Sequence, residues 1–264
     1  MLASIQHLLR YRALIQSLVA RELTARYRGS VLGLFWSFVN PLLLLLIYTF
    51  VFTRILKVDR GAASDHVAVF MFCGILPWTW FSSSLLESSS TLITNGNLIR
   101  KVVFPAEVLP LVVVTAGLVH FCLGLVILLG FIAFDGVDVA AIDLLWLPVL
   151  MAVQWLLTVG FALLLSALTV HFRDIRDLLG NLLTLWFFGT PILYGLDIVG
   201  PGVRRILELN PFTHLVVAYQ EVLVVPGQFV PGLGLALVAG GAVLLCAAGL
   251  VVFDRLRDTL AEDV

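Results

Sequence analysis

Few side chains in the long apolar segments of this sequence could transfer a proton. Between the ends of those segments stand only His120 and Gln154. An ion-driven carrier needs acidic or histidine side chains at mid-membrane depth, where one charge costs at least about 2.5–3.5 kcal/mol and is kept only for function. His120 has no acidic residue within a helical turn, so a packing role is the simpler interpretation. An intramembrane protease would need a Ser/His or Asp/Asp pair, and no obvious pair is present.

Nucleotide and metal chemistry also lack their usual residues. The chain has two lysines, Lys57 and Lys101, and neither follows a glycine, so the Gly-Lys-Ser/Thr phosphate loop of ATPases is absent from the sequence. Cys73, Cys122 and Cys246 lie in apolar runs without metal-site or disulfide spacing. We expect no cofactor or metal in this chain, and any ATPase that drives it must be a separate chain.

The composition is that of a polytopic membrane protein. Hydrophobic residues make up 61% of the 264 residues and charged residues 12%, against roughly 45–50% and about 25% in soluble domains. The basic residues are scattered at the ends of apolar runs, so no nucleic-acid partner is indicated. Arg10 and Arg12 interrupt the first apolar residues, and we therefore expect no cleaved signal peptide.

A membrane-spanning helix needs about 20 apolar residues, and the sequence has six apolar runs of about that length. We therefore expect an all-α fold with six membrane-spanning helices, which position the polar residues. The expected spans lie near residues 32–56, 67–86, 108–134, 143–170, 178–200 and 232–253. The run from His214 to Val225 is too short to cross and contains Gln220 and Glu221. We expect it to be re-entrant, within a segment at 203–225 that precedes the last helix.

Positive charge supports this topology, because Lys and Arg are retained on the cytoplasmic side. Six spans with both termini cytoplasmic place 11 of the 16 Lys and Arg residues inside. Before the first span, apolar residues recur at helical spacing between arginines, which predicts an amphipathic helix in the interface plane. We therefore divide the chain into an interface helix at 1–30 and a six-helix transmembrane domain at 31–264.

Two cytoplasmic loops stand out. The loop from Glu87 to Pro110 is longer than a plain connector needs to be, and Asn95-Gly96-Asn97 is a strong turn signal within it. The shorter loop HFRDIRD, from His171 to Asp177, indicates no more than a solvated helix end by itself.

With these features the chain resembles the membrane subunit of polysaccharide or polyol-phosphate ABC exporters, the family that moves lipid-linked O-antigen, capsule-related glycans and teichoic acids. The matching residues run in family order through nearly the whole chain: Arg26-Tyr27-Arg28-Gly29-Ser30, Leu32-Gly33, Trp36, Asn40-Pro41, Gly74, Leu76-Pro77-Trp78, Asn95-Gly96-Asn97-Leu98-Ile99, Lys101, Phe104-Pro105, Arg173-Asp174, Pro191, Tyr194 and Asn210-Pro211.

The resemblance implies a homodimer in the bacterial cytoplasmic membrane that pairs with two ATPase subunits and exports a lipid-linked glycan. It implies a coupling helix in the Glu87 to Glu107 loop, with Asn95, Asn97, Arg100 and Lys101 as candidate contacts. It makes the N-terminal segment, with Arg21, Arg26 and Arg28, the interface helix, and residues 203–225 a gate near the outer face.

A sugar polymer has hydroxyl-rich edges and apolar faces, so a conduit for it favours aromatic platforms and neutral hydrogen-bonding groups. The candidates are Phe35, Trp36, Asn40, Tyr48, Trp78, Trp80, Trp186, Phe187 and Tyr194. Helix packing or an interfacial aromatic belt is the alternative role for each. The alternative functions are an ABC exporter permease for drugs or small lipids and, more distantly, a stand-alone flippase for lipid-linked sugars.

Overall fold

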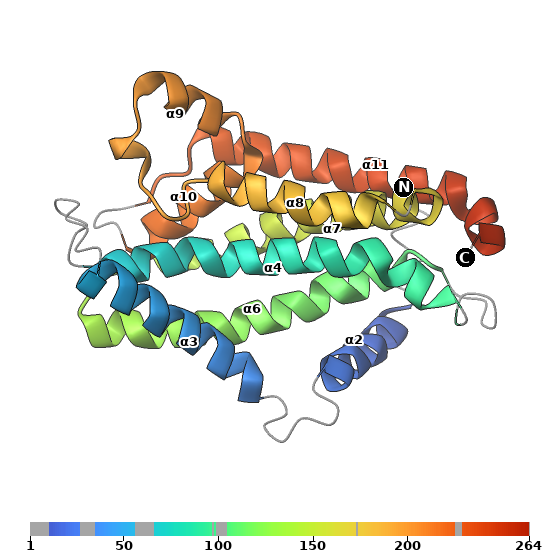
Figure 1. Ribbon diagram of the computed structural model, residues 1–264, viewed down its shortest axis with the longest axis horizontal. Helices are drawn as coiled ribbons and strands as arrows, with labels where there is room; N and C mark the ends of the chain where they lie inside the picture. The colour runs from blue at the N-terminus through green and yellow to red at the C-terminus, as the bar shows by residue number, and fades with distance from the viewer. Residues whose placement is uncertain are drawn as a thin grey trace.

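The structure is a computed structural model that describes residues 11–26, 35–55, 66–96, 98, 105–172, 174–224 and 229–263. All regular elements within these ranges are helical (Figure 1). The longer helices are α2 (Arg12–Arg26), α3 (Trp36–Thr49), α4 (Val67–Thr94), α6 (Val108–Asp135), α7 (Leu147–His171), α8 (Ile175–Phe188), α9 (Pro201–Glu208), α10 (Pro211–Leu223) and α11 (Leu233–Asp263). Three short pieces complete them: the π-helix η2 (Phe50–Ile55) and the 3₁₀ helices η4 (Asp143–Trp146) and η5 (Leu196–Ile198).

Among the described residues, four helical segments are long and apolar enough to cross a membrane. They are Val67–Thr94, Val108–Asp135, Asp143–His171 and Leu233–Arg255. They coincide with four of the six expected spans, and the described fold is all-α as predicted. The chain therefore has the architecture of a multi-pass membrane protein.

The other two expected spans are shorter helices. The segment at 32–56 contains α3, of 14 residues, continued by the π-helical residues of η2. The segment expected at 178–200 is not one helix, because α8 begins at Ile175 and ends at Phe188. Gly189 follows, and Thr190 precedes Pro191, a position that disfavours helical backbone. The chain continues through η5 and α9 instead.

Contacts between helix ends show that α4 runs antiparallel to α6, whereas α7 and α11 run parallel to each other. His66, before α4, lies with its Nδ1 2.6 Å from the Asp135 Oδ2 at the end of α6. The buried Asp143 carboxylate, at the start of η4, accepts a 3.0 Å hydrogen bond from the Phe229 N–H, just before α11. Both contacts lie at the end of the bundle that carries α9, opposite α2 (Figure 1).

Small residues allow α7 and α11 to approach closely. A Cβ atom added to Gly160 of α7 would lie 2.8 Å from the Cys246 nitrogen of α11, and one added to Gly249 would lie 3.1 Å from the Gly160 oxygen. Such small-residue contacts are a common basis of helix association in membranes, where lipid is as apolar as the side chains. The backbones of α7 and α11 are therefore in direct contact, and the two helices form one side of the bundle.

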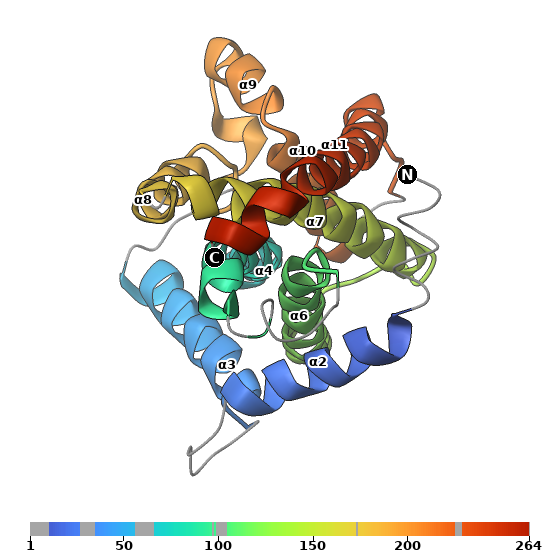
Figure 2. The same ribbon diagram turned by 90° about the vertical axis from the view of Figure 1, so that its right-hand side faces the viewer.

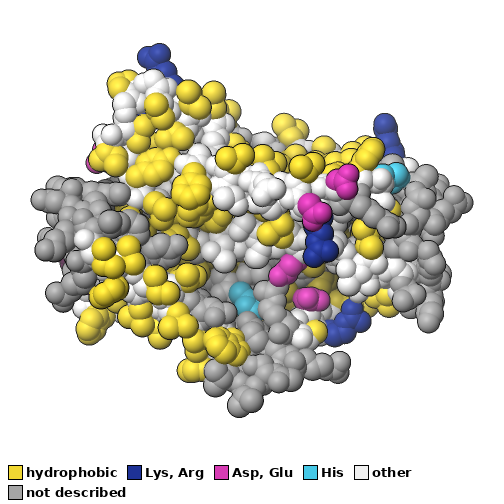
Figure 3. All heavy atoms as spheres, in the orientation of Figure 1, with side chains coloured by type: hydrophobic (Ala, Val, Ile, Leu, Met, Phe, Trp, Pro, Cys, Tyr) yellow, Lys and Arg dark blue, Asp and Glu magenta, His cyan; other side chains and the backbone are white. Residues whose placement is uncertain are grey.

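Viewed along the bundle from the α2 end, α4 and α6 lie centrally, with α3, α8, α7 and α11 around them (Figure 2). Helix α2 runs across the bundle axis and not along it. On the face in Figure 3, hydrophobic side chains cover much of the described surface, while most of the described charged ones gather toward the α2 end. This distribution suits a protein that contacts lipid along its length and water at its ends.

Candidate coupling pocket and aromatic cluster

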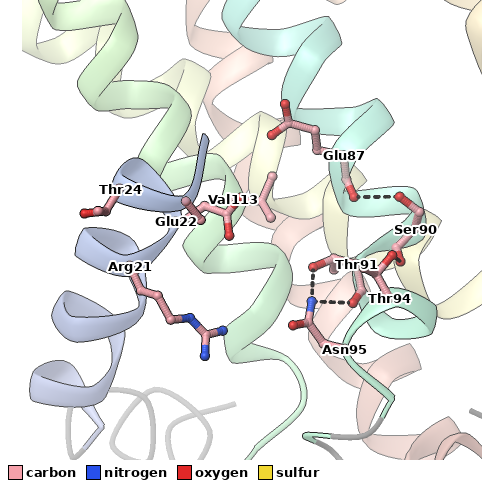
Figure 4. A pocket seen from close by; sticks show the side chains of 10 residues that line it. Arg21, Glu22, Thr24, Glu87, Ser90, Thr91, Thr94, Asn95 and Val113 are labelled. Carbon is pink, nitrogen blue, oxygen red and sulfur yellow. Dashed lines mark hydrogen bonds between the residues drawn. The ribbon is translucent and has the colours of Figure 1, made fainter. Parts of the chain in front are cut away.

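A polar pocket of about 680 Å³ lies between α2 and the last turns of α4 (Figure 4). Its α4 side is built from Ser90, Thr91, Thr94 and Asn95. The Asn95 Nδ2 donates a 2.9 Å hydrogen bond to the Thr91 carbonyl, and α4 ends at Thr94. The turn predicted at Asn95 therefore ends the helix, and its amide binds one of the last carbonyls of α4.

The opposite side of the pocket comes from α2. Arg21, Glu22 and Thr24 line it, and Glu87 of α4 adds a second carboxylate. In Figure 4 the Arg21 side chain extends from α2 on the side that faces Asn95. The structure thus brings together one residue expected to couple to an ATPase and one expected in the interface helix.

The pocket is held in place by packing between α2 and α6. Leu18 of α2 is buried with Val108 and Val112 of α6, and Leu14, Ile15 and Val19 lie against this cluster. These α2 residues recur at helical spacing, as the sequence pattern requires of an apolar face. Helix α2 is therefore amphipathic in its contacts, and its place in the membrane interface remains a prediction.

Several expected site residues are not described. Asn97, Arg100, Lys101 and Arg28 lie outside the described residues. Arg26 is the last residue of α2, and Asn40 and Tyr48 belong to α3, but their side chains are also outside what the structure describes. Their roles in coupling, the interface helix and the conduit remain predictions.

The expected conduit aromatics of α4 and α8 pack against each other. Trp78, which is 7% exposed, has its ring centroid 6.2 Å from that of Trp186 and 5.8 Å from that of Phe187. Phe212 of α10 lies edge-on to Trp78 at 5.2 Å. Within one chain this cluster favours the packing alternative for Trp78, which has little surface left for a substrate. Trp80 is likewise buried, and its Nε1 donates to the Val114 carbonyl of α6.

Three other expected conduit residues are more accessible. Phe35, just before α3, is 58% exposed, and the adjacent Trp36 is half-buried. Tyr194 is half-buried and donates its hydroxyl proton to the Phe188 carbonyl at 3.0 Å. Tyr194 therefore binds a carbonyl at the C-terminus of α8, a group that the ended helix leaves unpaired.

Asn210 joins α8 to α10, a role that the sequence analysis did not assign. Its Oδ1 accepts from the Trp186 Nε1 at 2.8 Å and from the Phe212 N–H at 3.0 Å, so it caps α10. Its Nδ2 donates to the Gly189 carbonyl at 3.0 Å and to the Thr190 hydroxyl at 2.9 Å. Asn before Pro is a recognised signal for a helix start, and this signal could have identified the cap, though not the contacts to α8.

The two polar residues first considered for proton chemistry have structural partners. The His120 Nδ1 lies 3.0 Å from the Ala116 carbonyl of its own helix. The buried Gln154 donates from Nε2 to the Pro77 carbonyl at 2.8 Å, linking α7 to α4. Among the described residues, no group of three His, Cys, Asp or Glu side chains is arranged to hold a metal ion. The contacts of His120 and Gln154 are those of residues that hold helices together.

A comparison of the sequence with protein families assigns the chain to a membrane-transporter family, in agreement with its multi-pass fold. Residues 13–224 match the ABC-2 type transporter family. This match covers most of the chain, including α2, the α4 end and α10. The chain belongs to the ABC-2 type transporter family and is a transport component.

Particular relatives narrow the comparison. The chain is similar to the O-antigen export system permease protein RfbA of Myxococcus xanthus, at 38% identity over 266 aligned residues that cover the whole of both chains. It is 30% identical to the Klebsiella pneumoniae protein of the same name, over 92% of this chain and 91% of the relative. It is also 23% identical to the polysialic acid transport protein KpsM of Escherichia coli, over 93% of this chain and 94% of the relative.

Proposed function

We propose that this chain is the permease subunit of an ATP-driven exporter of lipid-linked, O-antigen-like polysaccharide. The observation that carries this proposal is the 38% identity, over both full lengths, to an O-antigen export system permease. The described fold is consistent with it, because four of its helices are long and apolar enough to cross a membrane. ATP and Mg²⁺ are then bound by a separate subunit, two copies of which pair with two copies of this chain.

The proposed topology keeps six spans in the bacterial cytoplasmic membrane, with both termini cytoplasmic. The α2 end is the cytoplasmic one, since the sequence concentrates Lys and Arg on the loops and termini at that end. The first span is α3 with η2, and the fifth is α8 with the irregular segment to residue 200. Helices α9 and α10 form the re-entrant gate at the outer end; α10 has only 13 residues and is largely buried among α4, α7 and α11.

The coupling region is the pocket between α2 and the end of α4. The expected loop from Glu87 begins later than predicted, because α4 continues to Thr94. Helix α2 contacts α6, and α6 directly follows the segment at 95–107, so a displacement of that segment reaches both α4 and α6. Asn95 lies where the loop leaves α4, and Asn97, Arg100 and Lys101 continue from it. These residues form the surface that docks on the ATPase.

The transport path uses the aromatics that single-chain packing leaves accessible. Phe35 just before α3, Trp36 on α3 and Tyr194 after α8 are proposed to face the path, together with Asn40 and Tyr48. Exposed apolar residues on α3 and α8, such as Leu46, Leu182 and Leu185, provide surface for the second copy or for lipid. Trp78 and Trp186 do not line this path; they pack behind the residues that do, in contact with Phe212 and Asn210 at the start of α10.

The proposal is tested in cells that lack the chromosomal copy of this chain. Restoring the chain should restore surface glycan and should co-purify a second polypeptide that hydrolyses ATP. Export of small lipids or drugs with no change in surface glycan would favour the alternative substrate class. Transport of a lipid-linked sugar by the purified chain without any ATPase would favour the flippase and contradict the proposal.

A further inference from the structure

A second pocket, of about 510 Å³, lies between α2, α6, α7 and α11, apart from the coupling pocket and the aromatic cluster. Its wall is apolar along α7 and α11, where Leu156, Val159 and Ala247 are among the lining residues. Trp155 also lines it, and its Nε1 is already bonded to the Thr115 hydroxyl at 3.3 Å. The volume is within the range of roughly 300–1,000 Å³ typical of small-molecule sites.

The polar groups of this pocket are few and of both signs. Arg12 and Gln16 come from α2, and Glu107 comes from the residue before α6. Glu107 is only 8% exposed, and its carboxylate accepts no capping hydrogen bond from α6. The ion pairs between described residues do not include it. A carboxylate so buried ordinarily requires a partner, and none of the described residues bonds to it, so the pocket presents an acceptor for a ligand.

The pocket extends from the α2 end toward the middle of the bundle. On α7 its lining runs from Leu163 to Trp155, which is about 12 Å along a helix. The outward side of α11 beside it carries exposed apolar residues, including Leu237, Leu244 and Val251. The pocket is thus continuous with a surface suited to lipid and has its charges at the end where headgroups lie.

We propose that this pocket binds a zwitterionic ethanolamine phospholipid. The phosphate pairs with the Arg12 guanidinium, the ammonium donates to the Glu107 carboxylate, and one acyl chain lies between α7 and α11. An anionic lipid would satisfy Arg12 but leave Glu107 unpaired beside another negative charge, and a soluble polar ligand would leave most of the wall without a partner. The bound lipid joins α2 to α7 and α11.

The test uses the purified full-length chain, delipidated in detergent and titrated with lipid under native mass spectrometry. Phosphatidylethanolamine and phosphatidylglycerol with identical acyl chains are compared. We expect the ethanolamine lipid to bind at least tenfold more tightly, a difference of about 1.4 kcal/mol, since one charge-assisted hydrogen bond distinguishes the two lipids. Glu107→Gln should abolish that preference, and Arg12→Gln should weaken both lipids.

A matched pair of α11 variants locates the site. Ala247→Phe fills the pocket and should reduce binding of both lipids, whereas Ala248→Phe, on the adjacent exposed residue outside the lining, should not. Equal binding of the two lipids, a preference that survives Glu107→Gln, or equal effects of the two Phe variants would overturn the proposal. Retention of an isoprenoid-linked glycan in place of phospholipid would also overturn it and would assign the pocket to the transported substrate.

Discussion

Trp186 of α8 donates its indole proton to the Oδ1 of Asn210 over 2.8 Å, and this oxygen also caps α10. The Asn210 side chain therefore binds the end of α8 and caps the start of α10. The Trp186 ring lies against Trp78 and Phe81 of α4, so the α8, α10 and α4 segments share one junction. A change in the position of α8 would be transmitted to α10 through this contact.

Removing the Asn210 side chain should loosen that junction. Asn210→Ala loses the cap of α10, which costs about 0.5–2 kcal/mol, and leaves the Trp186 N–H without its partner. Trp186→Phe removes the N–H together with part of the packed ring, and should cost about 1 kcal/mol for the hydrogen bond plus a packing loss. Thermal unfolding of the purified variants in detergent is the measurement. In a double-mutant cycle the two losses should be less than additive, and full additivity would show that the contact contributes nothing.

The close approach of α7 and α11 predicts a strong effect at Gly160. Gly160→Val places side-chain atoms against the α11 backbone, where even a Cβ would lie 2.8 Å from the Cys246 nitrogen. We expect the protein level in the membrane fraction to fall sharply. Gly240→Ala on α11 is the control, because nothing lies within 4 Å of its added Cβ. It should leave the level unchanged or raise it, since Ala is favoured in helices by about 1 kcal/mol.

The coupling proposal predicts a defect in ATPase docking without a defect in insertion. Arg100→Glu with Lys101→Glu, and separately Arg21→Glu in the pocket, should reduce pull-down of the ATPase and surface glycan while the membrane-fraction protein stays normal. Arg205→Glu makes the same charge change on α9, at the other end of the bundle, and should leave pull-down intact. Unchanged pull-down and export in the first two variants would move the coupling role elsewhere.

Aromatic residues that line the conduit can be distinguished from those that pack the core by comparing glycan export with the amount of protein in the membrane. Replacing a packed aromatic by Ala costs about 3–5 kcal/mol and should lower protein levels, which we expect for Trp78 and Trp186. Replacing Trp36, Tyr48 or Tyr194 by Ala should impair export at near-normal abundance. The measurement is surface glycan relative to membrane-fraction protein for each single variant. Export that falls only in step with abundance would assign all of these residues to packing.

The amino-acid sequence alone determined the all-helical membrane class, four of the long helices and the turn at Asn95. These features depend on local properties: apolar length decides whether a helix can cross, and an Asn-Gly pair ends a helix through its own backbone preferences. The apolar face of α2 could be read for the same reason, since side chains at helical spacing share one side.

The tertiary structure decided the features that depend on distant partners. Apolar content continues past Phe188, and only the set of hydrogen bonds from Asn210 to Gly189, Thr190 and Trp186 shows how the end of α8 is held. The burial of Glu107 and its place in an apolar pocket likewise depend on α2, α7 and α11. Hydropathy measures each segment against lipid, whereas these positions are set by contacts between side chains far apart in the chain.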